Sequence, residues 1–346
     1  MLATNKYKVL IIAPSWVGDL VMSQTLFKLL KIQHGENLEL DVFANSWTID
    51  ILSRMPEVNN IIQNPFEHKK LSLSSRIRIG YNLRKHKYDQ VFVLPNSLKS
   101  AIVPFFAKIK RRTGFIGEFR YILLNDAYKL NKEALPRMVD RFCALANNGE
   151  KPYKVYYPHL EFDLQNRYEL IEKFKININK KLVAFCPAAE YGKAKRWLPE
   201  YFAQLADMLG EDECSILILG SKKDFDLGND IVCKTNKKES ITNLCGKTSL
   251  ADTIDIVTLC SNVVTNDSGL MHVACAVNTN VIAIYGSSSP NFTPPLSDKA
   301  QIVKIDLNCS PCFQRTCKYD HYNCLRFITP DVIYHRIKND ISKLAI

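Results

Sequence analysis

The sequence predicts an α/β protein made of two Rossmann-like domains that face a cleft. Two separate runs of alternating strand and helix patterns indicate parallel sheets covered by helices on both faces. A weakly patterned region containing prolines and lysines, at about 153–179, separates the two runs. The length of 346 residues also exceeds what one ordinary core accommodates. We therefore expect domains at 1–165 and 180–328, followed by a closing helix at 329–346.

The first half opens with an apolar run typical of a buried strand. We expect its strands at 8–13, 38–43, 60–63 and 90–94. The first helix is entered through the turn 14–19 and continues to about Gln33. The other helices, indicated by the spacing of apolar residues, span 47–54, 72–87, 97–107 and 137–147.

The second half repeats this alternation. Apolar, β-branched runs predict strands at 182–186, 215–220, 263–266, 281–285 and 301–305. Helical patterns occupy 201–209, 225–233 and 251–260, and another helix opens at Ser268 or Gly269. The last helix, 329–344, begins with Thr-Pro-Asp, which is a good helix start.

Charge narrows the class of partner. The formal net charge is +11 and the isoelectric point is about 9.0, which indicates an anionic partner such as nucleic acid, a phospholipid surface or a phosphorylated glycan. The N-terminus is polar and leads into a short apolar run, so it predicts neither a signal peptide nor a membrane span. We expect a cytoplasmic protein whose contact with a membrane is peripheral.

Three loops follow predicted strands at their carboxyl ends, where ligands bind in such folds. The loop at 15–19 carries Asp19, which either complements the helix dipole or acts as a general base. The loop at 187–199 carries Lys195 and Arg196, which either form a solvated basic loop or neutralise a leaving diphosphate. The turn at 266–269 enters a helix start suited to phosphate, although Asp267 or Ser268 could simply cap that helix.

Motifs along nearly the whole chain resemble a known family. They are Pro14–Asp19, Leu52–Asn59, Leu94–Ser97 with Lys99–Ala101, Arg112–Gly114 with Gly117–Glu118, Arg120–Tyr121 with Leu124–Asp126, Lys195–Trp197, Thr265–His272, and Ser288–Pro290 with Phe292–Pro295. On these residues the chain resembles the bacterial ADP-heptose–lipopolysaccharide heptosyltransferases of type II, in glycosyltransferase family 9. The resemblance implies the GT-B arrangement of two Rossmann-like domains, with the closing helix packing back on the first. The donor implied is ADP-L-glycero-β-D-manno-heptose, and the acceptor is the first heptose of the lipopolysaccharide inner core, on Kdo–lipid A. Transfer is implied to be inverting and independent of a catalytic metal.

The resemblance also implies roles for individual residues. Asp19 becomes the general base and Lys195 the diphosphate contact. The donor-binding residues are Arg196, Asp267, Ser268, Gly269 and His272, with Asp224 near the adenosine ribose. The acceptor-binding residues are Asn96, Ser97, Lys99 and Arg120. The chain departs from the family pattern at Ala188, Lys193, Leu198-Pro199 and Ser287.

The positive charge is concentrated between Phe66 and Tyr121, where 13 lysines and arginines face Glu67, Asp89 and Glu118. These side chains are either ordinary solvated helix faces or a surface for acceptor phosphates and the anionic inner leaflet of the cytoplasmic membrane. Interleaved aromatic residues would also suit single-stranded RNA, but no RNA-binding motif accompanies them, so we expect no nucleic-acid partner. A dehydrogenase is a further alternative, but the chain lacks the GxGxxG motif of that class, which weakens it. A type I heptosyltransferase is the nearer alternative.

The cysteines fall into two groups. Seven lie singly in apolar segments and are expected to be buried small hydrophobic residues. Cys309, Cys312, Cys317 and Cys324 cluster in a polar stretch that also holds His321. They form either a structural zinc site or a set of free thiols, since disulfides are rare in the cytoplasm. Such a zinc would brace the fold and take no part in catalysis.

Overall fold

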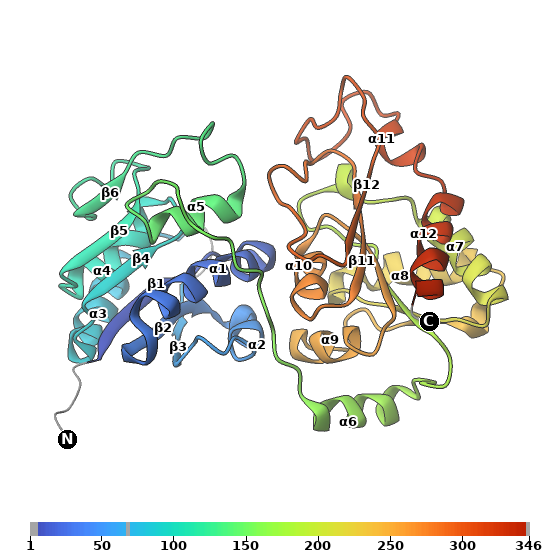
Figure 1. Ribbon diagram of the computed structural model, residues 1–346, viewed down its shortest axis with the longest axis horizontal. Coiled ribbons are helices and arrows are strands. Elements are labelled where there is room, and N and C mark those ends of the chain that lie inside the picture. The colour runs from blue at the N-terminus through green and yellow to red at the C-terminus, as the bar shows by residue number, and fades with distance from the viewer. Residues whose placement is uncertain (1–5, 67–69, 344–346) are drawn as a thin grey trace. The chain divides into compact units, whose positions relative to one another are not determined.

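The computed structural model describes residues 6–66 and 70–343, which form two α/β units (Figure 1). The division falls after Pro158, earlier than the predicted boundary at residue 165. Glu67 and Lys69 of the predicted basic stretch, and Leu344 of the predicted last helix, lie outside the described residues.

The first unit is built on a six-stranded, wholly parallel sheet. Its strands are β1 Tyr7–Ile12, β2 Leu38–Asn45, β3 Asn60–Asn64, β4 Gln90–Val93, β5 Arg111–Phe115 and β6 Asp126–Tyr128, in the order β3-β2-β1-β4-β5-β6. The helices are α1 Val17–His34, α2 Ile49–Leu52, α3 Leu73–Leu83, α4 Ile102–Phe106 and α5 Met138–Leu145. Because β1, β2 and β4 are covered by helices, their side chains are buried almost without a break.

The second unit repeats the same topology. Its strands are β7 Leu182–Cys186, β8 Ser215–Ile218, β9 Ile241–Asn243, β10 Asn262–Asn266, β11 Asn280–Tyr285 and β12 Ala300–Lys304, in the order β12-β11-β10-β7-β8-β9. The helices are α6 Leu164–Phe174, α7 Pro199–Glu211, α8 Phe225–Lys234, α9 Leu250–Val257, α10 Gly269–Ala276, α11 Asn323–Arg326 and α12 Pro330–Lys343. Each sheet order is that of a doubly wound Rossmann fold, so the predicted fold class is confirmed.

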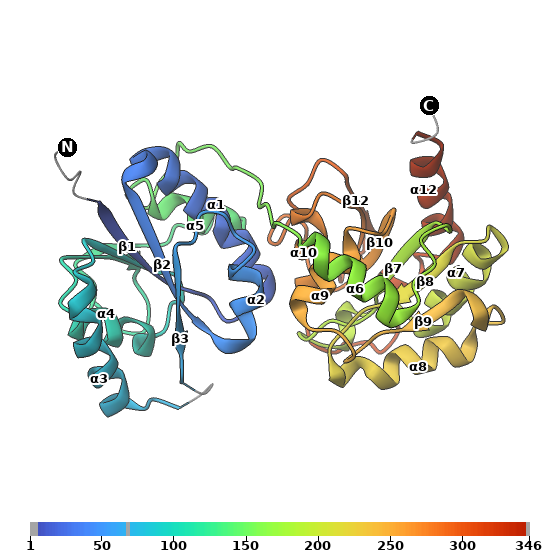
Figure 2. The ribbon, with the colours of Figure 1, turned by 90° about the horizontal axis from the view of Figure 1, so that it is seen from below.

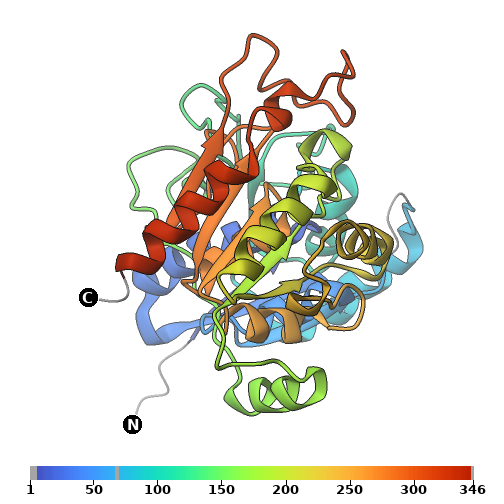
Figure 3. The same cartoon turned by 90° about the vertical axis from the view of Figure 1, so that its right-hand side faces the viewer.

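Two helices of the structure were not predicted from the sequence, namely α6 and the short α11. α6 lies in the region that was expected to be weakly structured, and Asp163 caps it by accepting the backbone N–H groups of Gln165 and Asn166. This helix packs beside α9 (Figure 2). The closing helix α12 packs on α7 of the second unit, where Ile333 and Ile337 enter the core (Figure 3). The prediction that it packs back on the first domain stays a prediction.

Three short strands were not predicted, namely β5, β6 and β9. The β5 sequence Arg-Arg-Thr-Gly-Phe lacks an apolar run, and β6 and β9 have three residues each. Hydrogen bonds to a neighbouring strand of the sheet define these segments, and local sequence carries little of that information. Among the described residues, no helix combines the length and apolar character that crossing a lipid bilayer requires.

Candidate functional site

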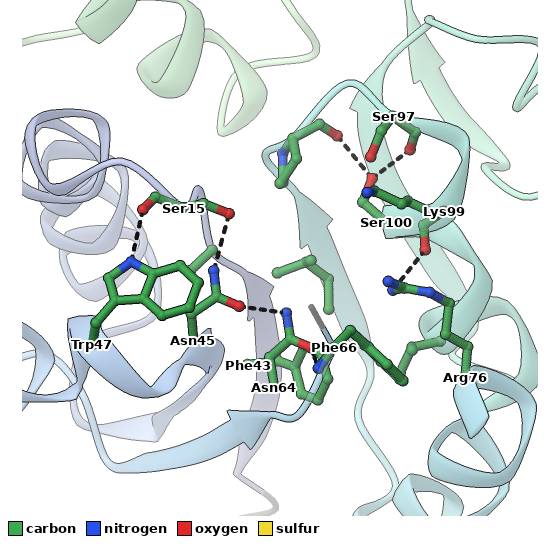
Figure 4. Close-up of a pocket in the computed structure, with 14 residues that line it drawn as sticks. Ser15, Phe43, Asn45, Trp47, Asn64, Phe66, Arg76, Ser97, Lys99 and Ser100 are labelled. Atoms are coloured by element: carbon green, nitrogen blue, oxygen red, sulfur yellow. Dashed lines mark hydrogen bonds between the residues drawn. The ribbon is translucent and has the colours of Figure 1, made fainter. Parts of the chain in front are cut away.

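A polar pocket lies at the carboxyl ends of the central strands of the first unit (Figure 4). The loops after β1, β2 and β4 reach it, as does Asn64 at the end of β3. Its lining includes Ser15, Asn45, Trp47, Asn64, Phe66, Arg76, Ser97, Lys99 and Ser100. We call it the first-unit pocket. Its place agrees with the rule that ligands of parallel sheets bind beyond the carboxyl ends of the strands.

Amide and hydroxyl groups form one wall of this pocket. Asn64 Nδ2 donates to Asn45 Oδ1 at 2.9 Å, and Asn45 Nδ2 donates to Ser15 Oγ at 3.0 Å. Trp47 Nε1 donates to the Ser15 carbonyl oxygen, yet 54% of this residue remains exposed. An ordered polar wall beside an open aromatic face suits a ligand with several hydroxyl groups.

Positive charge lies at the opposite side of the pocket. The Arg76 guanidinium stacks over Phe66, with its central carbon 3.9 Å from the ring centroid, and donates to the carbonyl oxygens of Leu71 and Lys99. Burial lowers the pKa of Arg76 from its ordinary value. Lys99 and Ser97, which were predicted to bind the acceptor, also line the pocket. The pocket can therefore hold an anionic, hydroxylated group.

Asp19 lies in the first turn of α1, directly after the loop that carries Ser15. It is partly exposed, and it already takes part in an interaction within the protein. The structure thus places Asp19 at the carboxyl end of β1, as the sequence predicted. Its role as a general base stays a prediction.

Arg120 does not present a binding surface. Its side chain is fully buried, and its guanidinium donates to the carbonyl oxygens of Phe115, Pro95 and Ser97 and to Asn96 Oδ1 and Ser100 Oγ. Burial lowers the pKa of Arg120 to about 10. The prediction of a direct acceptor contact is corrected, because Arg120 instead holds the loop 95–100 in place. Asn96 is exposed on that loop but is not among the residues that line the pocket.

The second unit brings Lys195 and Asp267 together at the carboxyl ends of β7 and β10. Lys195 Nζ lies 2.5 Å from Asp267 Oδ2, and the Thr293 hydroxyl donates to both oxygens of the same carboxylate. Asp267 is almost completely buried, whereas the Lys195 side chain keeps 15% of its surface exposed. Asp267 therefore orients the ammonium of Lys195, and this ion pair was not foreseen from the sequence.

The turn after β10 leaves a helix N-terminus available. Ser268 is the N-cap of α10, and its side chain makes no capping hydrogen bond. The first amides of a helix carry partial positive charge and bind anions when no side chain caps them. The alternative that Ser268 serves as an ordinary cap is therefore not what the structure shows.

Two buried hydroxyls complete this edge of the sheet. Ser287 and Ser288 follow β11, and neither hydroxyl has a hydrogen-bond partner. The Ser287 amide donates to the Ala194 carbonyl oxygen, which places the pair beside the loop that carries Lys195. Buried polar groups are normally satisfied, so two orphans beside a lysine indicate a place for a polar ligand. Sequence reasoning treated Ser287 solely as a departure from the family pattern.

His272 is unsuited to binding phosphate as a cation. It lies in α10 with 4% of its surface exposed. Burial lowers its pKa to about 4; the nearby Asp267 raises the pKa and Lys195 lowers it. The ring is therefore neutral near pH 7. The predicted contact of His272 with the donor would be a hydrogen bond from a neutral imidazole and not an ion pair.

The loop that carries Lys195 is fixed by its neighbours. The Trp197 amide donates to Asn266 Oδ1 at 2.9 Å, and the Trp197 indole donates to the Ile328 carbonyl oxygen. Arg196 is partly exposed, and its guanidinium donates to the Ala189 carbonyl oxygen. We call residues 187–199 the donor loop. The cations of this loop are held in position before any ligand arrives.

Asp224 has a structural task in this structure. Its Oδ2 accepts the amide and the hydroxyl of Ser221, which closes a capping box before α8. The residue is largely buried. Its predicted place near a ribose stays a prediction, although one carboxylate oxygen is already engaged.

The cysteine-rich segment 309–324 packs against the donor loop. The Ala194 amide donates to the Arg315 carbonyl oxygen, and the Tyr191 hydroxyl donates to the Phe313 carbonyl oxygen. A Cβ atom at Gly192 would collide with the Arg315 carbonyl oxygen, so the contact requires glycine. The segment therefore borders the candidate site and is not a remote brace.

The four thiols of that segment remain free in the structure. Burial raises the pKa of Cys324 to about 11, as does the proximity of Cys312, Cys309 and Cys317. Desolvation raises the pKa of the Cys317 thiol, but hydrogen bonds from the backbone N–H groups of 319–322 together outweigh it, so that this pKa is lowered. Among the described residues, no three His, Cys, Asp or Glu side chains are arranged to hold a metal ion. The zinc site stays a prediction that this arrangement does not itself support.

Comparison with known proteins finds relatives along nearly the whole chain. Residues 76–323 match the sequence profile described as glycosyltransferase family 9 (heptosyltransferase). The chain is 43% identical to lipopolysaccharide heptosyltransferase 2 of Escherichia coli K12, covering 98% of this chain and 99% of that protein. It is 45% identical to lipooligosaccharide heptosyltransferase 2 of Haemophilus influenzae, covering 86% of this chain and 88% of that protein.

Solved structures of heptosyltransferases have the same fold as this chain. The structure of E. coli ADP-heptose lipopolysaccharide heptosyltransferase II is similar with a TM-score of 0.88 and 37% identity, covering 98% of this chain and all of that one. An E. coli heptosyltransferase solved with ADP-2-deoxy-2-fluoro heptose has a TM-score of 0.71 and 16% identity, covering 96% of this chain and 99% of that one, and shows the same fold.

Proposed function

This chain belongs to glycosyltransferase family 9, the heptosyltransferases, and from that premise we propose that it transfers L-glycero-D-manno-heptose from ADP-heptose to the first heptose of the lipopolysaccharide inner core. Four relatives that carry the type 2 name are 40–45% identical over 86–98% of the chain, and two more are 26–27% identical over 96% of it. The alternative within the family is a type I enzyme, whose acceptor bears no heptose.

The observation that carries the proposal is the set of groups at the carboxyl edge of the second sheet. Lys195, the start of α10 and the orphaned hydroxyls of Ser287 and Ser288 all occur there. A diphosphate needs cations, amide donors and hydroxyl donors, and this edge supplies all three. We therefore assign the ADP part of the donor to the second unit.

We assign the acceptor to the first unit. The first-unit pocket combines an amide and hydroxyl wall with Arg76 and Lys99, which suits a phosphorylated core sugar. Asp19 follows the same strand end and is the proposed general base.

The proposed reaction is a single displacement with inversion. The acceptor oxygen forms a bond to the anomeric carbon of the heptose while the bond from that carbon to the ADP oxygen breaks. ADP departs with the electron pair, and Asp19 takes the proton of the acceptor hydroxyl. Lys195 and the α10 amides stabilise the charge that grows on the diphosphate. Because these groups provide positive charge at the diphosphate, we propose that transfer is independent of a catalytic metal.

The acceptor defines where the enzyme works. Kdo–lipid A is anchored in a bilayer, so we propose a cytoplasmic enzyme that acts as a peripheral protein on the inner face of the cytoplasmic membrane. The excess of positive charge between Phe66 and Tyr121 supports this placement, because that leaflet is anionic.

The test is transfer by purified protein from ADP-heptose to two truncated acceptors, followed by mass spectrometry. We expect a gain of one heptose on the mono-heptosylated acceptor and none on the acceptor that lacks heptose. The reverse pattern would identify a type I enzyme. No gain on either acceptor would contradict the proposal.

A further inference from the structure

The loop 117–123 exposes apolar side chains although it is firmly held. Phe119, Tyr121 and Ile122 are 89%, 61% and 82% exposed. Leu98 on the adjoining loop is also exposed. Isolated exposed apolar residues are ordinary, but a group of large ones on neighbouring loops usually marks a contact surface. We call Leu98, Phe119, Tyr121 and Ile122 the apolar tip.

The backbone beneath the tip is built to keep it in place. Between the exposed Phe119 and Tyr121, the buried guanidinium of Arg120 ties the loop to residues 95–100. Glu118 and Phe119 adopt positive φ angles of 42° and 57°, which non-glycine residues rarely adopt. Glu118 Oε2 accepts the Leu98 amide at 2.8 Å. An unfavourable backbone conformation and a desolvated arginine therefore keep apolar side chains exposed to solvent. Such a costly arrangement points to a partner that covers these side chains.

Basic residues are concentrated in the sequence around the loop. Six basic residues and one acidic residue, Glu118, lie between Leu98 and Asn125. Lys108 and Lys110 are exposed and line a second pocket together with Tyr81, Arg84, Phe105 and Arg112. Arg112 Nε donates to the Leu123 carbonyl oxygen at 2.7 Å, so this basic pocket adjoins the end of the loop. Apolar tips flanked by cations are complementary to an anionic lipid surface, whose headgroups are negative and whose interior is apolar.

The position of the tip also suits a membrane. Arg120 and Glu118 connect the loop to residues 95–100, and Pro95, Ser97, Lys99 and Ser100 line the first-unit pocket. The tip therefore lies beside the pocket assigned to the acceptor. An acceptor that is anchored in lipid can reach that pocket with its sugar while its anchor stays in the bilayer.

We propose that the apolar tip inserts into the anionic bilayer that carries the acceptor and that Lys108 and Lys110 contact its headgroups. This inference rests on the proposed function for its setting and deepens it by naming the surface. Neither a second copy of the chain nor RNA explains both the apolar tip and its place next to the acceptor pocket.

The experiment is flotation of the full chain with extruded vesicles that contain no acceptor. Vesicles of phosphatidylglycerol and phosphatidylcholine are compared with pure phosphatidylcholine, at low and high salt. We expect flotation with the anionic vesicles, weakened by salt because headgroup attraction is screened. Phe119→Ser with Ile122→Ser should lower the partition coefficient by about tenfold or more, since apolar area no longer leaves water.

Two further variants sharpen the result. Leu164→Ser with Tyr168→Ser removes comparably exposed apolar side chains from α6 in the second unit and should float as the native protein does. Lys108→Gln with Lys110→Gln should remove much of the salt-sensitive part of binding. Unchanged unfolding transitions would show that each variant is folded.

Several outcomes overturn the inference. They are failure of the native protein to float with anionic vesicles, equal flotation of the tip variant, and a dimer or an RNA complex that the tip variant abolishes while flotation is unchanged. Transfer to a water-soluble truncated acceptor separates this inference from the proposed function. The tip variant should keep that transfer. Absence of transfer by the native protein would contradict the proposed function but would leave the flotation result valid.

Discussion

Replacing Lys195 by methionine tests the second-unit site in both its stability and its chemistry. The ion pair with Asp267 is 2.5 Å long and largely buried. The variant leaves Asp267 with the Thr293 hydroxyl and without its ammonium partner. Breaking a buried pair by removing one partner costs about 3–5 kcal/mol. We therefore expect unfolding to become easier by about 3–5 kcal/mol.

The double variant Lys195→Met with Asp267→Asn separates the two effects. With both charges gone, no buried ion is left without a partner, and stability should return to within about 1 kcal/mol of the native protein. Urea unfolding followed by tryptophan fluorescence measures this, because Trp197 is buried in the same unit and its amide bonds to Asn266.

Activity should not return with stability. Each variant lacks the ammonium that we propose stabilises the departing ADP, so turnover should fall about 10²–10³-fold in both. A single variant as stable as the native protein would refute the assigned ion pair. A double variant with native turnover would refute the role of Lys195 in transfer.

Three further predictions follow from the other residues. Asp19→Asn should lower turnover by about 10²–10⁴-fold while ADP-heptose binding by calorimetry stays nearly unchanged, because the base acts on the acceptor; near-native turnover would remove Asp19 from that role. The pKa of His272 is lowered from its ordinary 6.5 to about 4 in the folded protein. Between pH 6.5 and pH 4 the unfolded chain therefore binds more protons than the folded protein does. The stability contributed by His272 is complete above pH 6.5 and is lost as the pH falls from 6.5 toward 4. His272→Gln should remove about 2 kcal/mol of the stability lost between pH 7 and pH 5, and parallel urea curves for both proteins check this. Short assays with EDTA should leave turnover unchanged, whereas metal analysis of reduced protein that finds about one zinc, lost in Cys312→Ser, would support the zinc prediction; metal-free protein with four titratable thiols in the segment would contradict it.

The sequence predicted the two-unit fold because its central strands are buried on both faces and therefore carry long apolar runs. It predicted the ligand-bearing edges for a related reason: polar residues follow those runs at Ser15–Asp19, in the donor loop and at Asn266–Ser268. Both signals are local, so one sequence was sufficient to detect them.

The remaining features depend on contacts between distant residues. Arg120 was expected to contact the acceptor on the strength of the family resemblance, and nothing in the local sequence shows that it bonds to residues 95–100. Likewise, Asp267 pairs with a lysine 72 positions away. The packing of α12 on α7 was also missed, since an amphipathic pattern gives the face that is buried but not the element that covers it.

The hydrogen bonds between the donor loop and the cysteine-rich segment have a consequence for protein engineering. The Tyr191 hydroxyl donates to the Phe313 carbonyl oxygen, the Ala194 amide donates to the Arg315 carbonyl oxygen, and Gly192 packs closely against that same carbonyl. A chimera that imports residues 187–199 from a relative, in order to change donor preference, would meet a mismatched surface in the resident 309–324. Grafts of the two segments together should fold and bind, whereas either segment transplanted alone should lose donor affinity even though every side chain that touches the nucleotide has been carried across.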